Sequence, residues 1–268
     1  MLHPVRVLWL SAFVWVVTLL PIVPAQAQTE VDLALVLAVD ISYSMDMDEQ
    51  ELQREGFAEA FRSPLVHDAI RNGMLGRIGV TYMEWAGLED QKVIIPWTVL
   101  DNSESLMAFA DRITSTPLRR AQRTSVSGAI DAAAKLFENS GLEANRKVID
   151  VSGDGANNQG RPVTHARDEA VARGITINGL PIMLKKPGSL DDPDLDIYFR
   201  DCVIGGQGAF MVPAREKEQF QQAIKTKIIL EVSGLLSPPA PLVTRAQSRD
   251  ARADCMAGET RWRDRTGN

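Results

Sequence analysis

Three short segments of the chain contain the side chains with which it could do chemistry. The first contains Asp40, Ser42 and Ser44, a carboxylate and two hydroxyls at alternate positions. The second contains Thr124, and the third contains Asp154 between two glycines. These groups offer only oxygen, the donor that hard cations such as Mg²⁺ prefer. The sequence therefore predicts an ion site, provided that the fold brings the three segments together.

The elements around these segments favour such a meeting. The nearly unbroken apolar run 31–39, directly before Asp40, is typical of a strand buried on both faces of a parallel sheet. Thr124 precedes a helical pattern over 125–137, and Asp154 follows a second apolar strand at 147–152. Open α/β sheets bind ligands at the carboxyl ends of their strands, so we expect all three loops at one edge of one sheet.

In order and approximate spacing, the three loops resemble the metal-ion-dependent adhesion site (MIDAS) of the von Willebrand factor A-domain (VWA) superfamily. That site uses an Asp-x-Ser-x-Ser loop, a Thr on a second loop and an Asp on a third. The resemblance covers about residues 30–234, and the chain looks most like the secreted bacterial VWA-like proteins of unassigned function. One departure is that the third loop reads Ser-Gly-Asp-Gly from Ser152, where many relatives have Thr-Asp-Gly.

The resemblance implies a function as well as a ligand set. It implies that Mg²⁺, or Mn²⁺ or Ca²⁺ in its place, is held by Asp40, Ser42, Ser44, Thr124 and Asp154. Two carboxylates balance the charge of a divalent ion but do not exceed it, so the ion still attracts one more anionic oxygen. In the superfamily, an Asp or Glu of a protein partner supplies that oxygen. We therefore expect a binding module that captures an acidic group on a protein ligand.

Strand and helix patterns alternate along the chain, which favours an α/β fold. We expect a doubly wound, mainly parallel sheet of the VWA or Rossmann-like kind, with helices on both faces. Two strands without a helix between them, over 77–100, indicate one antiparallel edge strand. The expected strands are 31–39, 77–85, 92–100, 147–152, 175–184 and 209–212, and the expected helices are 48–61, 103–113, 125–137, 163–172 and 216–231.

The ends of the chain differ in composition from the part between them. Arg6, an apolar stretch to Val23 and a small-x-small site ending at Ala27 predict a secretory signal peptide over 1–27. A membrane anchor is the alternative, but the stretch is short and is interrupted by Pro21. We expect one VWA-like domain over 28–234 and a disordered tail over 235–268, which begins with prolines and has little apolar content.

Net charge and cysteine content bear on the class of partner and on the cellular compartment. The formal net charge of −6 disfavours nucleic acid and anionic membrane surfaces as partners. A cleaved signal peptide predicts a periplasmic or secreted protein without an integral membrane segment. Cys202 and Cys255 could form a disulfide in such a compartment. We favour two unpaired cysteines, because the tail has few other residues that could hold Cys255 in place.

Two other functions are compatible with an oxygen-only ion site. A metal-dependent hydrolase of phosphate or sulfate esters would use the ion as a Lewis acid. Phosphotransferases of the haloacid dehalogenase class, however, need a second Asp two residues after the first, where this chain has Ser42. The ion could also only stabilise the loops. We favour the binding module, because the three loops supply hydroxyls and ligand carboxylates but no separate base or nucleophile.

Overall fold

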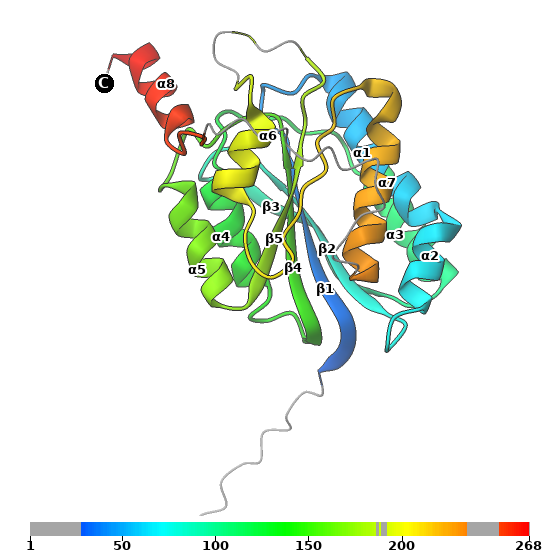
Figure 1. The fold of residues 1–268 in the computed structure, drawn as a ribbon. Coiled ribbons are helices and arrows are strands. Elements are labelled where there is room, and N and C mark those ends of the chain that lie inside the picture. Colours follow the sequence, from blue (N-terminus) through cyan, green and yellow to red (C-terminus); the bar gives the residue numbers. More distant parts are fainter. Residues whose placement is uncertain (1–27, 186–187, 189–191, 235–251, 268) are drawn as a thin grey trace, which may run out of the picture.

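A five-stranded sheet in the order β3-β2-β1-β4-β5 forms the centre of the computed structural model, which describes residues 28–185, 188, 192–234 and 252–267 (Figure 1). The strands are β1 (Thr29–Asp40), β2 (Ile78–Trp85), β3 (Gln91–Leu100), β4 (Leu142–Gly153) and β5 (Ile175–Pro181). The helical elements are α1 (Met47–Arg62), α2 (Pro64–Arg71), α3 (Ser103–Ser115), α4 (Val126–Leu136), α5 (Val163–Ala172), α6 (Leu195–Tyr198), the π-helical turn η1 (Phe199–Val203), α7 (Lys217–Ser233) and α8 (Ala257–Thr266).

The strand directions confirm the predicted fold class. β1 pairs in parallel with β2 and with β4, β4 pairs in parallel with β5, and only β3 is antiparallel to its neighbour. Asp40 lies opposite Trp85, and Val39 lies opposite Ser152. The carboxyl ends of β1, β2 and β4 therefore meet at one edge of the sheet.

Alternate residues of β1 enter two separate hydrophobic cores. Leu33, Leu35 and Leu37 pack in the core beneath α1, α3 and α7, whereas Val36 and Ala38 pack in the core beneath α4 and α5. Figure 1 shows these two groups of helices on opposite faces of the sheet. Each fully buried aliphatic side chain contributes about 1.5–3 kcal/mol. Burial on both faces is the reason that the run is apolar without alternation.

Some elements differ from the sequence-based expectation. The predicted strand at 209–212 is wrong, because this segment contributes only a single bridge, between Gly179 and Met211. A short apolar run between a glycine-rich turn and Pro213 is compatible with a strand but does not require one. Helix α2 is an element that the sequence-based expectation lacks, although it begins at Pro64, a residue suited to the first helical turn.

Two predictions about the C-terminal part of the chain are wrong. The expectation of disorder is wrong for 252–267, where the chain forms α8, and the preference for unpaired cysteines is wrong because Cys202 and Cys255 form a disulfide. Low apolar content does not exclude an ordered helix here, because a covalent bond and close backbone packing can fix a polar helix that buries little surface. The predicted signal peptide and residues 235–251 of the predicted tail lie outside the described residues.

Of the helices in the described ranges, none combines the length and apolar composition that a membrane crossing requires.

A buried ion-pair network joins α7 to β4, the strand that leads to the third candidate loop. The ammonium of Lys227 lies 2.8 Å from Asp150 and 2.6 Å from Glu231, and all three side chains are buried. Asn178 on β5 donates a hydrogen bond of 2.8 Å to Glu231. Burial raises the pKa of Asp150 to about 6, although Lys227 opposes the shift. The network fixes the position of α7 against the sheet.

We expect Lys227→Met to lower the free energy of unfolding by about 3–5 kcal/mol, because two buried carboxylates lose their counter-charge. Lys225→Met on the same helix is the matched control and should change it by less than about 0.5 kcal/mol. Urea denaturation measures both values. Equal stability of the two variants would contradict the assigned role of Lys227.

We also expect the double variant Cys202→Ala, Cys255→Ala to lose about 2–4 kcal/mol of unfolding free energy, because the bridge closes a loop with a sequence separation of 53 residues. Reduction of the wild-type protein should have the same effect, whereas the variant should not respond to reductant. Denaturation curves of the wild type that coincide with and without reductant would contradict the bridge.

Candidate functional site

The first two candidate loops are joined through their backbones at the carboxyl edge of the sheet. Asp40 ends β1, and Thr124 lies just before α4. The backbone amide of Tyr43 donates to Ala121 at 3.0 Å, and the amide of Ala121 donates to Ile41 at 3.1 Å. This short ladder holds the loop that contains Ser42 and Ser44 beside the loop that contains Thr124.

The third loop is joined to both of the others. The backbone amide of Asn158 donates to the carbonyl of Thr124 at 2.8 Å, and the amide of Thr124 donates to Oδ1 of Asn158 at 3.0 Å. Ser44 Oγ donates to Asp154 Oδ1 at 2.6 Å, and Ser42 Oγ lies 2.7 Å from Ser44 Oγ. Since Ser44 gives its proton to Asp154, Ser42 donates to Ser44. The structure thus brings all five predicted residues to one edge of the sheet.

Asp40 has the most unusual environment of the five. Its side chain is fully buried, and Oδ1 accepts a hydrogen bond of 2.7 Å from the amide of Ser42. Within the described part of the chain, Oδ2 is buried and has no hydrogen-bond partner. A Cβ at Gly153 would lie only 2.8 Å from Oδ2, so glycine allows the backbone of the third loop to approach this oxygen closely.

Burial raises the pKa of Asp40 well above its ordinary value, and the carboxylate of Asp154 raises it further. Hydrogen bonds from Ser42 and from the backbone of Asp154 lower this pKa by less. Two carboxylates that repel each other, one of them with a buried oxygen that lacks a partner, are destabilising unless a cation or a proton joins them. The site therefore fits a cation on physical grounds.

The donor set limits which cation the site can hold. It comprises two carboxylates and the hydroxyls of Ser42, Ser44 and Thr124. Among the described residues, no group of three or more His, Cys, Asp and Glu could hold a metal, so such a site depends on hydroxyl ligands. Oxygen ligands without imidazole or thiolate suit Mg²⁺, Ca²⁺ and Mn²⁺ better than softer ions.

A buried carboxylate holds the segment that leads to Thr124. Glu84 on β2 is fully buried and forms ion pairs with Arg54 of α1 and, at 3.3 Å, with Arg119. Arg54 also donates to the carbonyl of Thr116. Burial raises the pKa of Glu84, and both arginines oppose this shift. This network is not predictable from the sequence, because isolated charged residues in strand and helix patterns are usually exposed.

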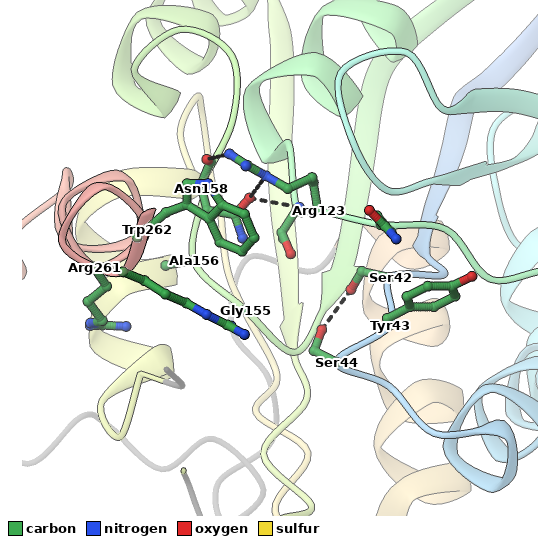
Figure 2. A pocket seen from close by; sticks show the side chains of 13 residues that line it. Ser42, Tyr43, Ser44, Arg123, Gly155, Ala156, Asn158, Arg261 and Trp262 are labelled. Carbon is green, nitrogen blue, oxygen red and sulfur yellow. Dashed lines mark hydrogen bonds between the residues drawn. The ribbon is translucent and has the colours of Figure 1, made fainter. Parts of the chain in front are cut away.

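Arg123, next to Thr124, has a backbone conformation that is rare for a residue with a side chain. Its φ is 72°, a backbone conformation that costs about 1–3 kcal/mol and persists only when surrounding contacts hold the residue in place. Its guanidinium donates to both the side-chain and backbone oxygens of Asn158 and stacks on Trp262 of α8 at 3.7 Å (Figure 2). The second loop, the third loop and α8 therefore support one another.

A pocket of 530 Å³ opens beside the candidate ligands. Ser42, Ser44 and Thr124 lie on its wall together with Tyr43. Figure 2 shows Trp262 and Arg261 on the side opposite Ser42, Tyr43 and Ser44. The contribution of α8 is not predictable from the sequence, because no local pattern indicates where a polar tail helix docks.

Comparisons with solved structures identify the fold. The pilus adhesin SpaC from Lactobacillus rhamnosus GG matches with a TM-score of 0.56 and 11% identity over 77% of this chain and 32% of its own. A von Willebrand factor type A protein from Catenulispora acidiphila matches with a TM-score of 0.54 and 14% identity over 75% of this chain and 43% of its own. The proximal thread matrix protein PTMP1 from the mussel byssus matches with a TM-score of 0.52 and 15% identity over 77% of this chain and 49% of its own.

The matched region spans about half or less of each of these longer proteins. No curated protein matches the chain. A family model described as "Protein of unknown function (DUF1194)" matches residues 30–236, which is most of the chain. The chain therefore belongs to the DUF1194 family, and its fold is that of the von Willebrand factor A domains.

Proposed function

We propose that this protein is an exported binding module that holds a divalent cation and uses it to capture an acidic group on a protein partner. The observation that carries this proposal is the buried Oδ2 of Asp40, which has no hydrogen-bond partner among the described residues. Burial and the carboxylate of Asp154 together raise the pKa of Asp40, and a cation beside the two carboxylates would offset both effects. The carboxylates would hold the ion together with Ser42, Ser44 and Thr124.

The ligand inventory supports capture of an anion. Two carboxylates only balance the charge of a divalent ion, so the ion continues to attract a further oxyanion. The pocket beside Ser42, Ser44 and Thr124 gives such a group access. Mg²⁺ fits this donor set, and Mn²⁺ or Ca²⁺ are alternatives. One PTMP1 structure is described as having a zinc-occupied MIDAS motif, which supports divalent ions as a class for this fold.

The groups around the site argue against a hydrolase. Asp40 and Asp154 would be engaged by the ion, and the three hydroxyls are poor bases at neutral pH. Lys185 donates to the carbonyl of Ser44 at 2.8 Å. Burial alone lowers the pKa of Lys185, but nearby carboxylates, above all Glu49, outweigh this and raise it. Lys185 therefore stays protonated and cannot serve as a general base.

Two observations support an exported protein. The first is the signal-peptide pattern over 1–27. The second is the disulfide between Cys202 and Cys255, because such bonds persist in oxidising compartments and are rare in the cytosol. The similar solved structures include one described as a pilus adhesin and one described as a thread matrix protein of the mussel byssus, and both descriptions are compatible with export.

We expect the metal-free protein to gain stability when Mg²⁺ or Mn²⁺ is added, by about 2.7 kcal/mol when the free ion is at a hundred times its Kd. Asp40→Asn should abolish this gain without destabilising the metal-free protein, because it removes a buried charge and keeps the shape of the side chain. Thermal unfolding and calorimetry measure both effects. Asp68→Asn, at an exposed position of α2, is the control and should respond as the wild type. An undiminished metal response in Asp40→Asn would rule out the site.

We expect no turnover of p-nitrophenyl phosphate or p-nitrophenyl sulfate by the pure protein at saturating Mg²⁺ or Mn²⁺. Among the described residues near the candidate ligands, Asp40 and Asp154 would be engaged by the ion, and Glu49 is ion-paired with Lys185, so none of them is available as a general base. Release of p-nitrophenol, followed by absorbance, tests this expectation. Turnover that follows metal occupancy and disappears in Asp40→Asn would replace the binding module with a hydrolase.

A further inference from the structure

We propose that the pocket between the ion site and α8 binds a second acidic group of the same partner, so that the protein recognises an acidic peptide segment rather than one isolated carboxylate. This inference rests on the proposed function and specifies its partner. The pocket is continuous with the ion site, because Ser42, Ser44 and Thr124 are part of its wall. A segment with one carboxylate at the ion would therefore place its neighbouring residues along α8.

The charge of this pocket is opposite to that of the chain as a whole. The formal net charge of the chain is −6, yet the described residues that line the pocket include Arg123, Arg261 and Arg265 and no Asp or Glu. Arg261 is partly neutralised by Asp192 at 2.8 Å. In the described ranges, Arg265 has no carboxylate at ion-pair distance and is exposed. A local positive surface on an acidic protein selects an acidic ligand.

Two of the three arginines that line the pocket lie against one aromatic ring. The guanidinium of Arg123 lies 3.7 Å from the ring of Trp262, and that of Arg265 lies 5.8 Å from it. Tyr43, on the pocket wall, is itself held by Arg120, which lies 4.9 Å from its ring and donates to its carbonyl at 2.8 Å. Stacked guanidinium groups lose less entropy when they bind a carboxylate in a bidentate manner. The pocket thus offers donors that are already partly ordered.

The wall formed by α8 is fixed to the third candidate loop. Cys255, two residues before α8, is bonded to Cys202. A Cβ at Gly258 would overlap the backbone carbonyl of Asn157, and Asn157 donates a hydrogen bond of 2.6 Å to Glu259. Because Asn157 lies three residues after Asp154, these contacts hold the helix against the loop that contains Asp154. The volume of 530 Å³ lies within the range of about 300–1,000 Å³ of ligand pockets.

The test compares two probe peptides on the full mature chain loaded with Mn²⁺, by calorimetry. Acetyl-Gly-Glu-Gly-Gly-amide offers one carboxylate, and acetyl-Glu-Glu-Glu-Glu-amide offers several. We expect the second peptide to bind about tenfold more tightly than the first. Arg265→Glu should lower the affinity for the tetraglutamate peptide about tenfold and leave the affinity for the single-glutamate peptide unchanged. Arg265→Gln, which removes the positive charge without adding a negative one and keeps a high helix propensity, should have a smaller effect in the same direction.

Arg263→Glu is the matched control, because it makes the same charge change on an exposed residue of α8 that does not line the pocket. It should alter either affinity by less than about twofold. Equal affinity for the two peptides, or equal losses in Arg263→Glu and Arg265→Glu, would overturn the inference and leave the proposed function intact. Mn²⁺ binding without binding of either peptide would overturn carboxylate capture and the inference together.

Discussion

The burial of the Asp40 carboxylate beside Asp154 is the interaction on which the rest of this site depends. Asp40 is buried because it ends β1, the central strand, which has helices on both faces. Oδ2 has no hydrogen-bond partner among the described residues, and burial, together with repulsion from Asp154, opposes ionisation of the Asp40 carboxyl group. A folded protein keeps such an arrangement when a ligand removes the unfavourable energy. A divalent cation is the ligand that these oxygens favour.

The surrounding structure holds the three loops in position before any ligand binds. Backbone hydrogen bonds join the first loop to the second, and Asn158 joins the second to the third. The buried Glu84 and its two arginines fix the segment that leads to Thr124, while Lys227 fixes α7 against β4. Each network contains buried charges that are stabilising only when all partners are present. Such rigid support keeps hydroxyl ligands, which bind cations weakly, close to one point.

The extent to which the sequence predicts this structure depends on how local each signal is. The apolar run before Asp40 and the order of the three loops predict the sheet and the position of the site, because buried parallel strands and their carboxyl ends have local patterns. The disulfide to Cys255 and the docking of α8 depend on contacts between distant segments, and the polar composition of the tail conceals them. The pairing of Glu84 with Arg54 is likewise not visible in the sequence, because it joins two distant segments.

Anomalous diffraction from crystals grown with Mn²⁺ tests the central claim most directly. The account predicts a single strong anomalous peak at the carboxyl edge of the sheet, within about 2.0–2.6 Å of carboxylate or hydroxyl oxygens from the loops of Asp40 and Asp154. The peak should be absent in Asp40→Asn crystals grown under the same conditions. A peak elsewhere, or no peak at this edge at saturating Mn²⁺, would contradict the account.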